Sequence, residues 1–178
     1  PGFADAERYL SFLDAAAKSA PRLRWLRDEG KSSFESLLEL GDIYSAQGSA
    51  RRARESFASV AAPVSGKARA LERLARLNLE AGRIVDARRT LQEARALDHN
   101  PTAPAMDRLA LTEALLLSSE RRVSAAVSLL ERLAPTLPAG PERDRAWFTL
   151  GTLQHEQKRD SDALASLERQ RPESRLSP

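Results

Sequence analysis

Three columns of small or large apolar residues recur along this 178-residue chain with one shared, irregular spacing. Successive members of every column are 34, 39 and 37 residues apart. Agreement among three columns predicts four copies of one unit, with insertions in connectors rich in Pro and Gly, where extra length costs little. The columns are Gly41, Ala75, Ala114 and Gly151; Ala53, Ala87, Ala126 and Ala163; and Phe57, Leu91, Leu130 and Leu167.

The stretch 74–94 shows what one unit contains. Apolar residues at helical spacing precede Gly82, and Ala87, Leu91 and Ala94 follow it at the same spacing. Gly82 therefore predicts the turn between two antiparallel helices. Small residues at the crossing let two helices approach to roughly 8–10 Å, while the large column fills the space beside them.

Composition supports an all-α chain, because it is 30% charged, 5% aromatic and rich in Ala, Leu, Arg and Glu. The net charge is +3, with both signs interleaved along the expected helices, so no basic face for nucleic acid is predicted. The absence of cysteine excludes disulfides and thiolate chemistry. No apolar run is long enough for direct membrane insertion.

The first unit resembles the tetratricopeptide repeat (TPR). Leu37, Leu40-Gly41 and Tyr44 match its first-helix pattern, and Ala53 and Phe57 match its second helix. The fourth unit matches the first-helix pattern with Trp147 and Leu150-Gly151. The third departs, because Glu113 replaces an expected Leu and Arg121 stands where the turn glycine often falls.

The resemblance implies an all-α, right-handed superhelical solenoid of antiparallel helix hairpins. We expect residues 1–20 to be the second helix of a truncated preceding repeat and residues 21–33 to be a linker or short helix. Cut ends expose apolar surface, so a homodimer through them is also expected. The four repeats are expected at 34–67, 68–106, 107–143 (irregular) and 144–178, the last with a tail.

In this family the first helices line a concave groove that binds a partner. Arg69, Arg73 and Arg76 recur on one helical face, where they could grip an acidic segment of a partner. The alternative is a solvated stripe neutralised by nearby acids. Carried over repeat by repeat, the partner-binding groove comprises Glu35, Leu38, Glu39, Asp42, Arg69, Glu72, Arg73, Arg76, Arg108, Arg145, Phe148, Thr149, Thr152 and His155.

No constellation for catalysis, a cofactor or a metal is predicted. Gly30-Lys31-Ser32 resembles the end of a phosphate-binding loop, but Trp25 occupies the position of the required earlier glycine. His99 and His155 lie in different units, and neither belongs to a compact ligand cluster.

A second basic feature follows the expected turns. Arginines recur there in successive units, and they form either a solvated edge or, if aligned across repeats, a ridge that attracts phosphate or acidic protein. These residues are Arg51, Arg52 and Arg54; Arg88 and Arg89; and Arg121 and Arg122.

The sequence therefore predicts a non-catalytic protein-protein interaction scaffold, a fragment of a larger protein, that binds a protein or peptide in the concave groove. One alternative is a periplasmic recruitment segment of a bacterial export or outer-membrane assembly machine. Another is a sensor or regulatory module coupled to a separate output domain. The compartment stays open between bacterial periplasm and cytoplasm, although the lack of cysteine favours the periplasm.

Overall fold

The computed structural model describes residues 22, 25–26, 33–61, 63–97 and 103–169. Arg22, Trp25 and Leu26 are helical, whereas the expected helix at 1–20, the motif at 30–32 and His99 lie outside the described residues. The described part otherwise consists of helices joined by short turns. In chain order these are α2 (Phe34–Ala46), α3 (Ala50–Ala58), α4 (Val64–Glu80), α5 (Ile84–Leu97), α6 (Ala103–Ser119), α7 (Val123–Leu133), α8 (Pro141–Glu156) and α9 (Asp160–Arg169).

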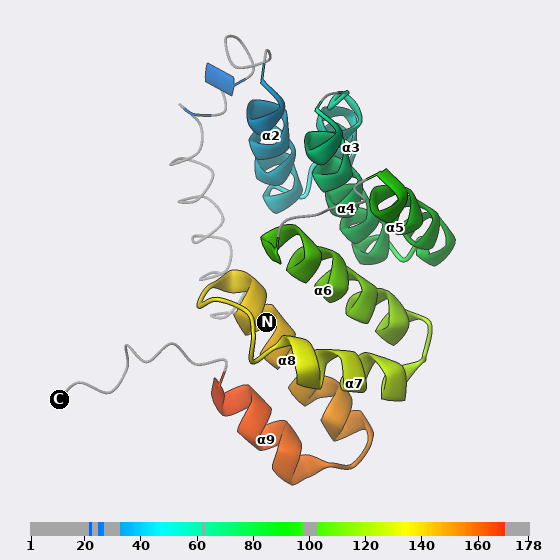
Figure 1. The fold of residues 1–178 in the computed structure, drawn as a ribbon, viewed down its shortest axis with the longest axis vertical. Coiled ribbons are helices and arrows are strands. Elements are labelled where there is room, and N and C mark those ends of the chain that lie inside the picture. Colours follow the sequence, from blue (N-terminus) through cyan, green and yellow to red (C-terminus); the bar gives the residue numbers. More distant parts are fainter. Residues whose placement is uncertain (1–21, 23–24, 27–32, 62, 98–102, 170–178) are drawn as a thin grey trace, which may run out of the picture.

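The helices pair in chain order as four hairpins that stack along the long axis of the molecule (Figure 1). The first helices also contact one another in order, α2 with α4, α4 with α6 and α6 with α8. A hairpin of this size buries only part of its apolar surface, so stacking completes the core. The expected solenoid of helix hairpins is confirmed.

The four tight turns share one hydrogen-bond pattern. After α2, the Gly48 amide donates to Ser45 O at 2.9 Å and the Ser49 amide donates to Tyr44 O at 2.8 Å. The same two bonds recur at the other three turns, a Schellman arrangement that satisfies the last helical carbonyls. It requires a left-handed residue, and the φ angles are 69° at Gly48, 70° at Gly82, 61° at Arg121 and 61° at Lys158.

Helix starts are also encoded locally. The Ser33 side chain accepts a hydrogen bond from the Ser36 amide at 3.1 Å, which caps α2. Pro141 opens α8 directly after Gly140, and Glu142 lies in the first helical turn, where a carboxylate is favoured by the helix dipole.

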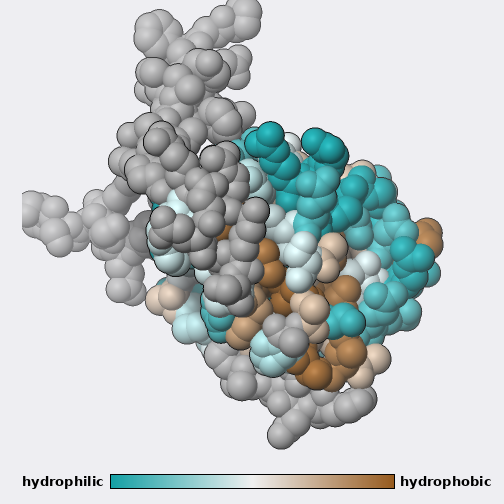
Figure 2. Space-filling model, turned by 90° about the horizontal axis from the view of Figure 1, so that it is seen from above, coloured by the Kyte–Doolittle hydropathy of each residue, from teal (hydrophilic) through white to brown (hydrophobic). Residues whose placement is uncertain are grey.

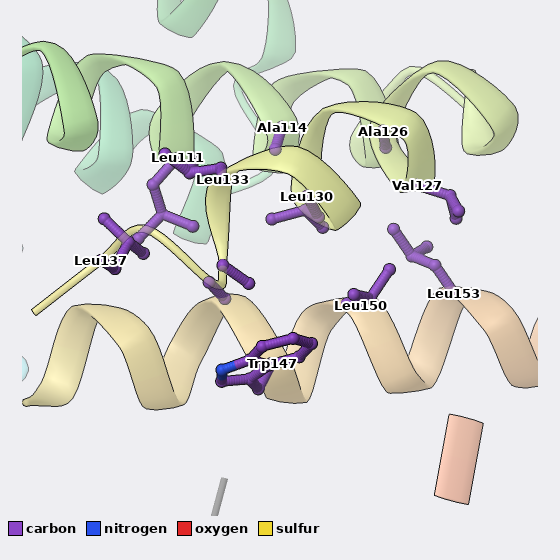
Figure 3. Packing of buried hydrophobic residues seen from close by; sticks show 12 residues of the cluster. Leu111, Ala114, Ala126, Val127, Leu130, Leu133, Leu137, Trp147, Leu150 and Leu153 are labelled. Carbon is purple, nitrogen blue, oxygen red and sulfur yellow. The ribbon is translucent and has the colours of Figure 1, made fainter. Parts of the chain in front are cut away.

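The core is continuous across hairpins because each contributes side chains to its neighbour. Val127 and Leu130 of α7 point toward Leu153 and Leu150 of α8, and all four are at most 3% exposed (Figure 3). The column of Gly and Ala residues on the first helices, which includes Gly151, permits the close packing of the two helices in each hairpin. A Cβ added at Gly151 would lie 2.7 Å from Leu167 Cγ, inside van der Waals contact.

The irregular third hairpin keeps the common register. Ala114 and Ala126 are both fully buried, as the columns predict. Glu113, at the position of an expected Leu, forms an ion pair with Arg95 of α5 in the preceding hairpin. A charged pair between neighbouring hairpins therefore replaces the apolar contact that the repeat pattern would otherwise provide.

Candidate partner-binding cleft

A polar cleft of about 470 Å³ lies between α2, α4 and the start of α8. It combines first helices from the first, second and fourth hairpins, because the superhelix curves enough to bring α8 toward α4. We refer to this site as the cleft. Its lining residues are Asp42, Ser45, Ala46, Arg73, Arg76, Glu80, Pro141, Glu142 and Arg145.

Two ion pairs connect the walls of the cleft. Arg73 Nη2 lies 3.2 Å from Asp42 Oδ2, which joins α4 to α2. Arg76 Nη1 lies 3.7 Å from Glu142 Oε1, which joins α4 to α8. The second pair joins the second hairpin to the fourth, which are not adjacent in the stack. It therefore forms because the array curves, and not because adjacent hairpins pack against each other.

Burial alters the acid–base properties of the first pair. Desolvation raises the pKa of Asp42, and the positive charges of Arg73, Arg76 and Arg69 oppose that rise. Desolvation also lowers the pKa of Arg73, opposed mainly by Asp42. The pair is therefore held in a partly dry environment, where electrostatic interactions are stronger than at an open surface.

The cleft presents three guanidinium groups and three carboxylates, so its formal charge is balanced. The arginine stripe expected to meet a partner is thus partly neutralised, Arg73 by Asp42 and Arg76 by Glu142. Arg145 is exposed and makes no ion pair within 4.0 Å to another described residue. Arg145 is therefore the cleft cation most available to a ligand.

The structure brings Asp42, Arg73, Arg76 and Arg145 together, as the groove expectation places them. Two other expected groove residues are not accessible: Leu38 is 2% exposed and Glu72 is 3% exposed. Their placement on the groove surface was wrong, because the α-helical face that carries them packs against the next first helix. Glu72 instead accepts a hydrogen bond from Thr112 Oγ1 of α6 at 2.6 Å.

The other expected groove residues on α2, α4 and α6 lie outside the cleft lining. Glu35 is exposed, and Glu39 accepts two hydrogen bonds from Arg22 at 2.8 and 2.6 Å. The guanidinium of Arg69 lies 5.9 Å from the ring centre of Phe34. Arg108 lines a small void beside Glu72.

On α8, beyond the cleft, the expected residues stay near the surface. Phe148 is 53% exposed. Thr149 is half-buried, and exposed Thr152 donates its hydroxyl to Phe148 O at 2.9 Å. His155 Nδ1 lies 2.7 Å from Asp160 Oδ1, and both side chains are exposed.

The expected groove set leaves out five lining residues of the cleft: Ser45, Ala46, Glu80, Pro141 and Glu142. Glu80 ends α4, Ser45 and Ala46 stand at the end of α2, and the other two begin α8. No local pattern marks the residues of α2 and α8, because they become neighbours of α4 only through the accumulated rotation of the stack.

The arginines that follow the turns mostly belong to surface ion pairs. Arg88 Nη2 lies 2.6 Å from Glu120 Oε1, and Arg122 Nη1 lies 3.7 Å from Glu120 Oε2. Arg89 lies 3.2 Å from Asp86. Seen from the α2 end, hydrophilic residues form a broad band along one flank of the described surface (Figure 2). This arrangement supports the solvated edge over a phosphate-attracting ridge.

The described residues also bear on two other kinds of site. No three His, Asp or Glu side chains gather there as ligands of a metal ion would. In that same part of the chain, none of the helices is both long and apolar enough to cross a membrane.

Solved structures share this architecture. MamA aligns with a TM-score of 0.53 at 20% identity, covering 96% of this chain and 93% of that chain. The ArsTM double mutant of MamA RS-1 aligns with a TM-score of 0.54 at 17% identity, over 90% of each chain. A Podospora anserina protein described as a kinesin light chain with nearly identical TPR-like repeats gives a TM-score of 0.57 at 17% identity, covering 96% and 98%.

These similarities establish the fold, an all-α TPR-like solenoid, and confirm the fold class expected from the repeat columns. The chain matches no protein-family model and no curated protein sequence.

Proposed function

We propose that this chain is a non-catalytic interaction scaffold that binds a partner protein or peptide in the cleft. Solenoids of this type present an extended concave surface to other proteins, which supports the general role. The single observation that carries the more specific proposal is the cleft between α2, α4 and α8, with its exposed Arg145, which pairs with no acid of the described residues.

The chemistry of the cleft favours a partner segment that carries a carboxylate. A guanidinium can hold a carboxylate through two parallel hydrogen bonds, and Arg145 is not engaged by a described acid. Arg76 is 3.7 Å from Glu142, a long ion pair that a ligand carboxylate can replace. We infer that the acidic group of the partner lies between Arg76 and Arg145.

Phe148 supplies an apolar contact for the same segment. It follows Arg145 by three residues on α8, so both side chains project from the same side of the helix. Exposed aromatic side chains beside charged groups are common anchors in protein interfaces. The proposed ligand is therefore an acidic residue flanked by an apolar one.

Selection from a displayed peptide library tests this proposal with a defined set of ligands. We expect enrichment of peptides that pair Asp or Glu with an apolar residue, and loss of their binding in the Arg76→Glu, Arg145→Glu variant. The matched control is Arg54→Glu, Arg132→Glu, which makes the same charge change at exposed positions on α3 and α7. Equal loss in the control, or no loss in the cleft variant, would contradict the proposal.

A further inference from the structure

A buried carboxyl group lies at the interface between α4 and α6. Glu72 is 3% exposed, and Thr112 Oγ1, itself on a residue 2% exposed, donates to its Oε1 at 2.6 Å. The equivalent positions in the other hairpins are Leu38, Leu111 and Phe148. The repeat therefore places an apolar side chain here in three copies and an ionisable one in the second.

The surroundings of Glu72 do not compensate an ionised carboxylate fully. Its Thr112 hydrogen bond is the one polar side-chain contact of Glu72 within the described residues, and a carboxylate has room for about four. The adjoining void has a volume of about 10 Å³, close to the minimum for one water molecule. Burial accordingly raises the pKa of Glu72, opposed by the Thr112 hydrogen bond and by Arg76 and Arg73.

Charged groups face Glu72 from each neighbouring helix. Glu142 of α8 adds to the rise in the pKa of Glu72. Asp42 of α2 acts on the same site through its ion pair with Arg73. The cations are Arg69, Arg73 and Arg76 on α4 and Arg108 on α6, yet none of them lies within the 4.0 Å of an ion pair with Glu72.

We propose that Glu72 is a proton-controlled element of the α4–α6 interface that sets the width of the cleft. Neutral Glu72 stays packed against Thr112 and keeps α4 close to α6. Ionised Glu72 needs more hydrogen-bond donors, and water that enters between the two helices supplies them.

Opening of this interface reaches the cleft through the stacking order. Because α6 lies between α4 and α8 in the stack, separating α4 from α6 also moves α4 away from α8. The Arg76–Glu142 contact, already 3.7 Å long, then lengthens and the cleft widens. This device belongs to the fold and does not depend on which ligand the cleft binds.

The absence of cysteine makes a distance measurement direct. Cysteines introduced at Ala58 of α3 and Ser161 of α9, both exposed, carry spin labels on the first and last hairpins. We expect the distance between the labels to lengthen as the pH rises from about 4 to about 9 while the helical content stays constant. In Glu72→Gln the distance should stay at the low-pH value, because Gln keeps an acceptor for Thr112 without a titratable charge.

Two controls separate Glu72 from its neighbours. Asp42→Asn should leave the pH response in place, whereas Thr112→Val should move it to higher pH, because the carboxylate loses its donor. If Glu72→Gln does not fold, Glu72→Leu provides the same test with the residue found at Leu38 and Leu111. A constant distance in the parent, or a response in the neutral variant equal to that of the parent, would overturn the proposal.

Discussion

Gly41 on α2 lies directly against the ring of Phe57 on α3, so closely that an added Cβ would overlap three ring atoms. The two residues are one pair in the columns of small and large residues. The second and third hairpins use Ala and Leu at these positions, as in Ala75 with Leu91, and the fourth pairs Gly151 with Leu167. The ring of Phe57 therefore leaves no room for a side chain at Gly41.

Gly41→Ala should destabilise the protein by about 1–3 kcal/mol, because Phe57 is 1% exposed and has little room to move. Phe57→Leu alone should also destabilise it by leaving a cavity. The double variant recreates the Ala–Leu pair of the second hairpin, so its loss should be smaller than the sum of the single losses. Urea denaturation of all four proteins measures this coupling, and additive losses would refute the pairing.

The left-handed turn positions offer a gain in stability. Lys158 has φ 61°, a conformation that costs a residue with a Cβ about 1–2 kcal/mol relative to Gly. After the greater chain entropy of Gly in the unfolded state is subtracted, Lys158→Gly should stabilise the protein by about 0.5–1 kcal/mol. Arg121→Gly should do the same, since its φ is also 61°.

The midpoint of chemical denaturation measures these gains. Ala165→Gly in the neighbouring helix α9 is the matched control, and it should lose about 1 kcal/mol because Gly is unfavourable inside a helix. A loss of stability in both turn variants would show that their side chains contribute more than the strain costs.

The Arg95–Glu113 pair joins α5 to α6 at the irregular repeat. Both side chains remain partly exposed, at 45% and 34%, so we expect a coupling energy of about 0.2–1 kcal/mol from a double-mutant cycle with Arg95→Gln and Glu113→Gln. The coupling should fall toward zero at about 1 M salt, where surface charges are screened. A coupling that is independent of salt would mean that packing, not charge, joins the two side chains.

Stability should decline with rising pH because of Glu72. Its pKa in the folded protein is above the ordinary value of 4.5, so the folded state holds the proton more tightly than the unfolded state. The contribution is present below that ordinary value and is lost as the pH rises through the raised pKa. Glu72→Leu should flatten the pH dependence of the melting temperature and raise that temperature at neutral and alkaline pH. An unchanged slope would assign the decline to another group.

Much of the architecture could be predicted because its determinants are local. Gly48 and Gly82 mark left-handed turns, and the hydrophobic periods on either side identify the helices that those turns join. The common hydrogen bonds at Arg121 and Lys158 show that the turn persists even without Gly. Packing of the flanking helices offsets the conformational strain of a left-handed residue that has a Cβ. In the third hairpin the second-helix pattern was the clearer one, and its Ala126 and Leu130 are fully buried.

The cleft was predictable only in part. The first-helix pattern placed Asp42, Arg73, Arg76 and Arg145 on one surface, but it gave no reason to pair Arg76 with Glu142, 66 residues away. It also placed Glu72 in the groove, although that side chain packs against α6. The apolar face of a helix is about 100° wide, and each residue turns the helix by about the same angle. Neighbouring positions in the sequence can therefore differ between accessible and buried.

The sequence by itself determined four helix hairpins, their turns and the small and large residues that pack each one, because those contacts join residues close along the chain. Only the tertiary structure decided which first helices meet across the concave side and which charged groups are buried between them. The reason is geometric: the small rotations at the three interfaces between hairpins add up. The sequence of a single repeat does not encode their total.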